Sequence, residues 1–326
     1  MKFSIFTVAD HYPEKHRSIA QLYAEIEQQC ILADELNFDS FFVAEHHFHE
    51  YGAIPNPSVF LSALAKKTSA IKLGPAISIL PFHNPLTVAE DYAMLDVISN
   101  GRLILGVGSG YLKHEFEGFN ISAEEKRNKF DENLQILKLA LSGKRFSYKG
   151  NYFFADNIKL NVKPVQENVP VYVAVLRAEA AYHVGKRGQN IICVPYASVN
   201  TFDEVKILAA DFRKGFKESG KKEKGETLFA FHTHIAETDE KAKQNAEEAF
   251  NLYADTRLYV KKQNYTDILN SGLALIGSVE TVSKKITRLK EFGIDNVLLL
   301  MNFGMLENEK VKNSMKLFSE VFLQKR

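Results

Sequence analysis

Apolar segments of strand length alternate with segments of helical periodicity along almost all of this 326-residue chain. We expect strands over residues 1–8, 38–43, 71–80, 101–108, 171–176, 191–195, 228–235 and 297–300. Strands separated by helices pair in parallel through right-handed crossovers, because each helix returns the chain to the same end of the sheet. The alternation therefore predicts an α/β fold, a single (β/α)8 TIM barrel that takes up residues 1–326 as one domain.

The helical segments carry start and stop signals of their own. Ser278 precedes the helix expected over residues 279–292 as an N-cap, and a glycine follows that helix as a stop. Ser18 begins the first helix in the same way, and prolines open the helices expected over residues 57–68 and 85–98. These local signals place helices where the alternation requires them.

One long stretch does not fit the alternation. Residues 142–169 follow the fourth helix, expected over residues 123–141, and they are irregular and rich in aromatic side chains. We predict a small insertion after the fourth helix, formed as a hairpin that packs over the barrel rim.

Composition restricts the class of partner. Hydrophobic residues make up 45% and charged residues 25% of the chain, which are ordinary values for a globular protein with a large core. The formal net charge of +1 provides no electrostatic footprint for nucleic acid or for an acidic membrane, and no apolar run has the length of a membrane span. We therefore expect no nucleic acid and no membrane as partners. The N-terminus lacks the pattern of a signal peptide, and Cys30 and Cys193 are expected to be free, packed thiols of a cytoplasmic protein.

The most reactive cluster in the sequence is Glu45, His46 and His47, directly after the strand over residues 38–43. Barrels of this kind place their chemistry where strands end, and imidazole is the side chain best suited to move protons near neutral pH. A hydrogen-bonded structural cluster and a metal site are the alternatives, because imidazole and carboxylate also bind zinc and iron. We predict no metal, since no second cluster with ligand spacing is evident.

Two other strand ends have polar or glycine-rich sequences. The run from Gly106 to Gly110 follows the fourth strand, where its backbone could approach an anion or a flat ring. On spacing alone, a tight turn that needs small residues is the favoured interpretation of this run. Arg177 follows the fifth strand and could hold a phosphate at the start of a helix, although a surface ion pair with Glu179 is an equal alternative.

His232 and His234 share one face of a strand, where two buried histidines are a simpler interpretation than metal ligands.

The order of these motifs is more specific than any one of them. Glu45-His46-His47-Phe48, Leu80-Pro81, the run from Gly106 to Gly110 and Ile276-Gly277-Ser278 stand in this sequence in the order that resembles the bacterial luciferase-like flavin monooxygenases. The resemblance covers nearly the whole chain. It implies a barrel that binds reduced FMN at the carboxyl ends of its strands.

The resemblance also implies roles for individual residues. His46 matches the catalytic histidine, and Glu45 and His47 match its neighbours. Ala76 and Ile77 fall where relatives have a non-proline cis peptide bond behind the flavin ring. The positions that match cofactor-binding residues are Ala76, Ile77, Gly108, Ser109, Gly110, Arg127, Val175, Leu176, Arg177 and Ala178. The substrate is expected near Tyr196, His232 and Asn302.

The activity implied is that of a two-component monooxygenase. A separate flavin reductase would supply reduced FMN, because the chain shows no nicotinamide module of its own. Molecular oxygen and a small organic substrate would then react in a site that excludes water, with His46 controlling protons and Glu45 or a backbone group fixing its tautomer. Relatives often dimerise through the second and third barrel helices, which predicts a homodimer.

Departures from the family pattern limit this transfer. Bacterial luciferase has an arginine where this chain has Ser109, and its long lid corresponds to a short lid region over residues 252–276 here. Tryptophan is absent, so light emission is not expected. Three alternatives stay open: hydride transfer with a deazaflavin coenzyme, flavin binding without catalysis, and a metal-dependent hydrolase built on Glu45, His46 and His47.

Overall fold

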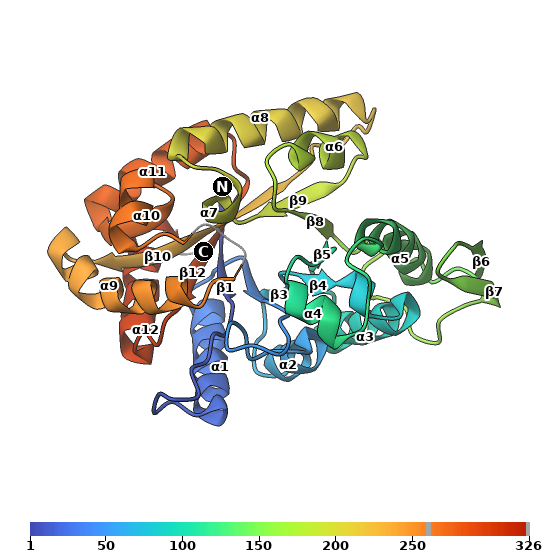
Figure 1. Cartoon of the computed structure of the whole chain (residues 1–326), viewed down its shortest axis with the longest axis horizontal. Coiled ribbons are helices and arrows are strands. Elements are labelled where there is room, and N and C mark those ends of the chain that lie inside the picture. Colours follow the sequence, from blue (N-terminus) through green and yellow to red (C-terminus); the bar gives the residue numbers. More distant parts are fainter. Residues whose placement is uncertain (259–261, 324–326) are drawn as a thin grey trace.

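The computed structural model describes residues 1–258 and 262–323 as a closed barrel of parallel strands surrounded by helices (Figure 1). The main sheet has ten strands, and eight barrel positions remain when β11 is set aside and β3 and β4 are counted as one interrupted strand. The barrel strands are β1 (Lys2–Thr7), β2 (Ser40–Val43), β3 (Lys72–Pro75) with β4 (Ser78–Ile79), β5 (Leu105–Gly108), β8 (Val171–Val175), β9 (Asn190–Cys193), β10 (Thr227–Ala236) and β12 (Asn296–Asn302). The predicted α/β barrel is confirmed.

The barrel closes between β3 and the segment that leads into β5. The backbone N–H of Leu73 donates to the carbonyl of Arg102, and the N–H of Ile104 donates to the carbonyl of Leu73, both at 2.9 Å. The strand predicted over residues 71–80 is divided because the Ala76–Ile77 peptide bond between β3 and β4 is cis. The resemblance had predicted a cis bond at this place, and the structure confirms it.

Helices connect the barrel strands and cover the outside of the barrel (Figure 1). They are α1 (Ile19–Glu35), α2 (Pro57–Ala65), the 3-10 turn η1 (Leu80–Phe82), α3 (Pro85–Ile98), α4 (Lys113–Gly118), α5 (Lys126–Leu141), α6 (Ala180–Lys186), α7 (Pro195–Ser198), α8 (Phe202–Glu218), α9 (Asp239–Asp255), α10 (Tyr265–Ser271), α11 (Val279–Glu291) and α12 (Asn308–Phe322). The side chains of Ser18 and Ser278 accept hydrogen bonds from the amides of Gln21 and Thr281, as expected of N-caps. Over the residues described, no helix combines the length and the apolar composition that crossing a bilayer requires.

The predicted hairpin in the insertion is present but lies beside α5. Strands β6 (Phe146–Lys149) and β7 (Phe154–Ile158) are antiparallel and project beyond α5 at the right of Figure 1. The Glu132 carboxylate on α5 accepts hydrogen bonds from the backbone amides of residues 151–153. This anchor holds the turn against α5 rather than over the barrel rim.

The predicted lid region over residues 252–276 includes residues 259–261, which lie outside the described residues. Its described parts are the last turn of α9, the helix α10 and the beginning of β11 (Ala274–Ser278). Strand β11 was not predicted. It pairs in parallel with residues 232–236, the C-terminal half of β10. The segment between α9 and α10 follows directly on a helix whose inner face packs in the core.

Candidate active site

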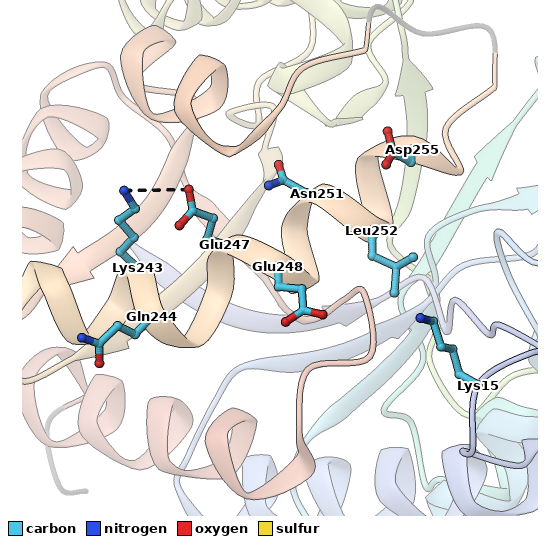
Figure 2. A pocket seen from close by; sticks show the side chains of 8 residues that line it. All are labelled: Lys15, Lys243, Gln244, Glu247, Glu248, Asn251, Leu252 and Asp255. Atoms are coloured by element: carbon cyan, nitrogen blue, oxygen red, sulfur yellow. Dashed lines mark ion pairs between the residues drawn. The ribbon is translucent and has the colours of Figure 1, made fainter.

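An open depression along the outer side of α9 is a surface feature without reactive groups. It is bordered by charged and amide side chains of α9 and by Lys15, and Lys243 and Glu247 form an ion pair of 3.8 Å along it (Figure 2). Exposed pairs of this kind are screened by water and contribute little. The depression shares no residue with the cavity described next.

A cavity of about 580 Å³ opens at the carboxyl ends of the barrel strands. Small-molecule sites occupy roughly 300 to 1,000 Å³, so this volume fits a cofactor or substrate. Its wall includes at least one residue from each barrel strand or from the turn that follows it: Phe6, Ala44, Ile77, Ser109, Val175, Ile192, Ala230 and Leu298. This is the end of a TIM barrel where reactive side chains gather.

His46 lines this cavity just beyond β2 and is held by a buried carboxylate. Its Nδ1 lies 3.0 Å from Oε1 of Glu115 on α4, and the same oxygen accepts a 3.0 Å hydrogen bond from the amide of His47. An ionised carboxylate only accepts, so the pair assigns a proton to Nδ1 of His46. The hydrogen bond that the His46 side chain makes among the described residues uses Nδ1, which leaves Nε2 available to a ligand in the cavity.

Burial controls the charge of His46. Burial lowers the pKa of the imidazole, and the hydrogen bond and negative charge of Glu115 offset only part of that shift. The positive charge of Arg257 lowers the pKa further. His46 is therefore neutral at pH 7, with a proton on Nδ1 and a lone pair on Nε2.

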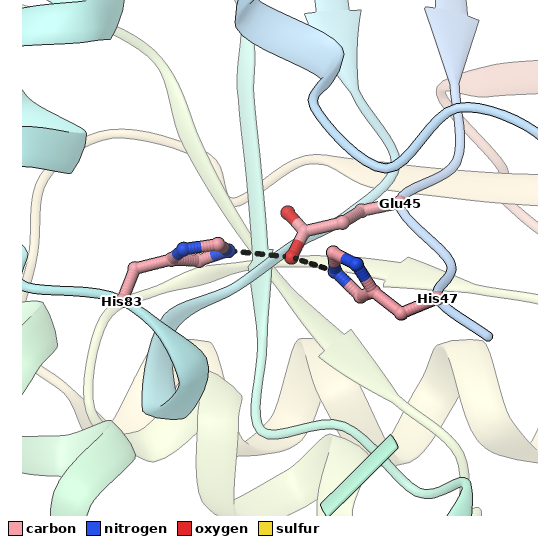
Figure 3. A group of neighbouring side chains, drawn as sticks. All are labelled: Glu45, His47 and His83. Carbon is pink, nitrogen blue, oxygen red and sulfur yellow. Dashed lines mark hydrogen bonds and ion pairs between the residues drawn. The ribbon is translucent and has the colours of Figure 1, made fainter. Parts of the chain in front are cut away.

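Glu45 does not orient His46, which corrects the expectation from the sequence. Its Oε1 accepts from Nε2 of His47 at 3.1 Å and from Nε2 of His83 at 2.6 Å (Figure 3). Consecutive residues of an extended chain point to opposite sides, so Glu45 and His47 lie on the same side and His46 on the other. Glu115, 69 residues away in sequence, takes the orienting position.

Glu45, His47 and His83 form a hydrogen-bonded network centred on the Glu45 carboxylate. Burial would raise the pKa of Glu45, but the hydrogen bonds from both histidines outweigh it and lower the pKa. Burial would lower the pKa of His83, yet the contact with Glu45 raises it. The three ligating atoms lie within 4.8 Å of one another, close enough for one metal ion. Because His46 is not among them, the geometry does not bring together the three-residue metal centre considered from the sequence.

Cations border another part of the cavity. Lys126 and Arg127 in the first turn of α5, and Arg177 after β8, all line it. The guanidinium of Arg127 lies 3.5 Å from the carboxylate of Asp131, and the Arg127 side chain is 49% exposed. Asp131 also pairs with Arg187 at 2.9 Å, so it balances only part of the charge of Arg127. The mouth of the cavity is therefore positive, which suits a phosphate.

The glycine-rich run from Gly106 to Gly110, whose first three residues belong to β5, is explained mainly by close packing of strands. A Cβ on Gly108 would lie 2.1 Å from Cδ1 of Ile77, and a Cβ on Gly106 would lie 2.4 Å from the carbonyl oxygen of Pro75. Ser109 and Gly110 come next and do line the cavity. Only the end of the run can therefore contact a ligand.

The structure brings most of the predicted site residues together around this cavity. Those that line it are Glu45, His46, Ala76, Ile77, Ser109, Gly110, Arg127, Val175, Leu176 and Arg177. Those outside its lining are His47, Gly108, Ala178, Tyr196, His232 and Asn302. All three residues predicted to contact the substrate, Tyr196, His232 and Asn302, therefore lie outside the cavity lining.

His232 and Tyr196 lie in an aromatic layer next to the cavity. The His232 ring is 5.5 Å from that of Tyr196 and 4.8 Å from that of Tyr253, and neither of its nitrogens has a partner among the described residues. Burial lowers the pKa of His232 to about 3, so the ring is a neutral core group. His234 is bound instead to Asn245, with Nε2 at 3.1 Å from the amide nitrogen.

Asn302 points away from the cavity because β12 contains an irregularity. Phe6 pairs with Leu300, but the next residue, Thr7, pairs with Asn302. The extra residue turns Asn302 to the outside of the barrel, where its amide donates to Gln29 on α1 at 3.0 Å. The expectation that Asn302 contacts substrate is corrected accordingly.

Three groups that bear on the site were not predicted from the sequence, and of these only Arg257 lines the cavity. Glu115 is hydrogen-bonded to His46 and His83 is hydrogen-bonded to Glu45. No sequence motif places Glu115, His83 or Arg257 near residue 46. Cys193, by contrast, lines the cavity without a chemical role, because burial raises the pKa of its thiol to about 12.

Comparison with known proteins identifies the family. The sequence profile of the family described as luciferase-like monooxygenase matches residues 1–296. The uncharacterized protein y4wF of Sinorhizobium fredii is 35% identical over 60% of this chain and 57% of the relative, so the chain spans little more than half the length of that protein. The oxygenase component of flavin-dependent trigonelline monooxygenase from Acinetobacter baylyi is 24% identical over 98% of this chain and 94% of the relative.

Solved structures and a further relative complete the comparison. Monooxygenase RslO1 from Streptomyces bottropensis matches with a TM-score of 0.91 at 27% identity over 99% of both chains. The oxygenating constituent of 3,6-diketocamphane monooxygenase from Pseudomonas putida, solved with FMN, has a TM-score of 0.84 at 20% identity over 98% of this chain and 97% of that one. An F420-dependent glucose-6-phosphate dehydrogenase from Amycolatopsis mediterranei is 28% identical over 52% of this chain and 53% of the relative. The profile match over residues 1–296 shows that the chain belongs to the luciferase-like monooxygenase family.

Proposed function

We propose that this chain is the oxygenase of a two-component flavin monooxygenase that acts on a small organic substrate. Reduced FMN would supply two electrons, so that one atom of dioxygen enters the substrate and the other leaves as water. One observation carries the proposal: the same cavity contains a neutral histidine and, in another part of its wall, three cations. The histidine is His46, which Glu115 holds in place.

The residues present fit FMN. Lys126, Arg127 and Arg177 would hold the phosphate, and the ring would lie against Ala76 and Ile77 in the apolar part of the cavity. The FMN bound to the Pseudomonas putida protein supports this choice of flavin. The apolar walls would exclude water, while the free Nε2 of His46 would accept or return a proton at the reacting centre.

A flavin reductase is the partner that we propose. The name of the Acinetobacter baylyi relative describes it as an oxygenase component, which supports a divided system. Reduced FMN would then diffuse from the reductase to the barrel. We also propose a cytoplasmic location, because both cysteines are free and buried rather than paired.

A screen with independently supplied reduced FMN tests the proposed activity. A panel of organic compounds is incubated with the protein, an unrelated flavin reductase and ¹⁸O₂, and products are analysed by mass. Incorporation of one ¹⁸O atom is the expected result. Turnover with a reduced deazaflavin but no oxygen uptake with reduced FMN would instead identify the hydride-transfer alternative.

Replacing Arg177 by alanine is expected to weaken FMN binding much more than riboflavin binding. Only FMN has a phosphate, and loss of a charge-assisted hydrogen bond costs about 1.5 to 3 kcal/mol, roughly 10- to 100-fold in Kd. Calorimetric titration with both flavins measures the difference. Arg145→Ala, on the exposed hairpin, is the matched control and should change neither affinity. Equal weakening of both flavins would place the phosphate elsewhere.

We propose that two copies associate through α2 and α3. Val59 on α2 is 68% exposed, and Met94 and Val97 on α3 are 50% and 47% exposed. Apolar side chains exposed on adjacent helices favour contact with a second copy. Light scattering should report a dimer for the native chain and a monomer for the double variant Met94→Lys, Val97→Glu. A native chain that is monomeric at micromolar concentration contradicts this assembly.

A further inference from the structure

Arg257 is a buried cation that lines the cavity beyond the end of α9. Only 5% of the residue is exposed. Its Nη1 donates to the hydroxyl of Tyr253 at 2.7 Å, and its Nη2 lies 3.5 Å from the hydroxyl of Tyr111. The ring of Tyr51 lies 4.2 Å from the guanidinium carbon. Arg257 is thus enclosed by tyrosines that stack on it or accept from it.

The charge of Arg257 is not balanced by the part of the protein that the structure describes. No carboxylate within residues 1–258 and 262–323 forms an ion pair with it, and its Nε has no hydrogen-bond partner. Asp10 is the acid whose charge reaches it, but that carboxylate accepts from Tyr12 and from the amide of Gly304, each at 2.7 Å. Burial lowers the pKa of Arg257 to about 9, so it remains charged at neutral pH. A buried unpaired cation is costly unless an anion joins it.

Arg257 lies near the reacting end of the cavity. The Tyr51 ring that stacks on Arg257 also contacts His46, with ring centroids 4.4 Å apart. The cations proposed for the FMN phosphate come from α5 and the turn after β8, and α5 and α9 lie on opposite sides of the barrel (Figure 1). The FMN phosphate can therefore bind without Arg257. Arg257 is then available to bind a second anion near His46.

We propose that Arg257 binds the carboxylate of the organic substrate, and that this oxygenase acts on organic acids whose apolar or aromatic part packs against Tyr51 and Tyr111. The inference rests on the proposed function for its reaction, but the binding site itself does not require turnover. The planar guanidinium offers two parallel N–H groups to a carboxylate, a geometry that a neutral amide does not match.

Equilibrium binding of benzoate and benzamide tests this inference without any reaction. Both probes have the same ring, and only benzoate is an anion. Calorimetric titrations are run on the flavin-free protein and again at saturating oxidised FMN, which fills the phosphate mouth. The native protein is expected to bind benzoate about 10- to 100-fold more tightly than benzamide, as expected for one charge-assisted pair. Equal affinity for the two probes, or no binding of benzoate, overturns the proposal.

Variants assign the preference to Arg257. Arg257→Met should remove the preference for benzoate, Arg257→Lys should keep part of it, and Arg127→Ala should leave it unchanged while weakening FMN. Thermal unfolding checks that each variant is folded, and the native comparison of the two probes decides the question if Arg257→Met does not fold. If Arg257→Met weakens riboflavin rather than benzoate, Arg257 contacts the flavin ring and the inference is wrong. Failure to bind any flavin would contradict the proposed function while the benzoate result still stands.

Discussion

Replacing His46 by alanine is expected to lower the formation of oxygenated product by about 10² to 10⁴, as for loss of a general acid or base. Binding of FMN should be unchanged, because the proposed ring and phosphate contacts come from the link between β3 and β4, the turn after β8 and α5. Oxygen would still be consumed, with hydrogen peroxide replacing the oxygenated product. The measurement is the ratio of product to hydrogen peroxide per oxygen consumed, together with the Kd for FMN.

His47→Ala separates the roles of the two adjacent histidines. His47 does not line the cavity and donates to Glu45, so its loss should lower stability more than the product ratio. The finding that would overturn this assignment is a native product ratio in His46→Ala together with loss of a bound metal in His47→Ala. That pair of results would make the Glu45, His47 and His83 group a functional metal site.

The second large effect is expected for Glu115→Leu. Leucine leaves Nδ1–H of His46 and the amide of His47 without an acceptor in a buried place, which costs about 1 to 3 kcal/mol for each donor. Product formation should also fall about 10- to 100-fold, because loss of a partner that orients a reactive imidazole has effects of that size. Denaturant unfolding and the product assay measure the two consequences separately.

A pH profile distinguishes orientation of His46 from a purely structural role of Glu115. Glu115 raises the pKa of His46 against burial, so its removal must lower that pKa further. The limb of the activity profile that reports His46 should therefore move to lower pH. Glu117→Leu, on the exposed side of the same helix, is the control and should move neither stability nor the profile. A limb that stays in place in Glu115→Leu would make Glu115 structural only.

The fold could be predicted from the sequence because it depends on local patterns. Each strand and helix carries its own periodicity and caps, and the barrel follows from their alternation. The position of His46 at the end of β2 was predictable for the same reason. Glu115 and Arg257 were not, because their contacts with the site join segments far apart in the chain and neither stands in a local motif. Asn302 was misplaced because the pairing irregularity between β1 and β12 leaves no mark in the residue pattern.

The His46–Glu115 pair and Arg257 come from segments far apart in the sequence, but the Tyr51 ring contacts both His46 and Arg257. The pair joins the turn after β2 to α4, whereas Arg257 follows the last turn of α9 and precedes α10. Because the Arg257 charge lowers the pKa of His46, a substitution of Arg257 that changes what the cavity accepts is also expected to raise the pKa of the imidazole. A change in the anion that this cavity accepts is therefore expected to come with a change in the pH range over which His46 can take up a proton.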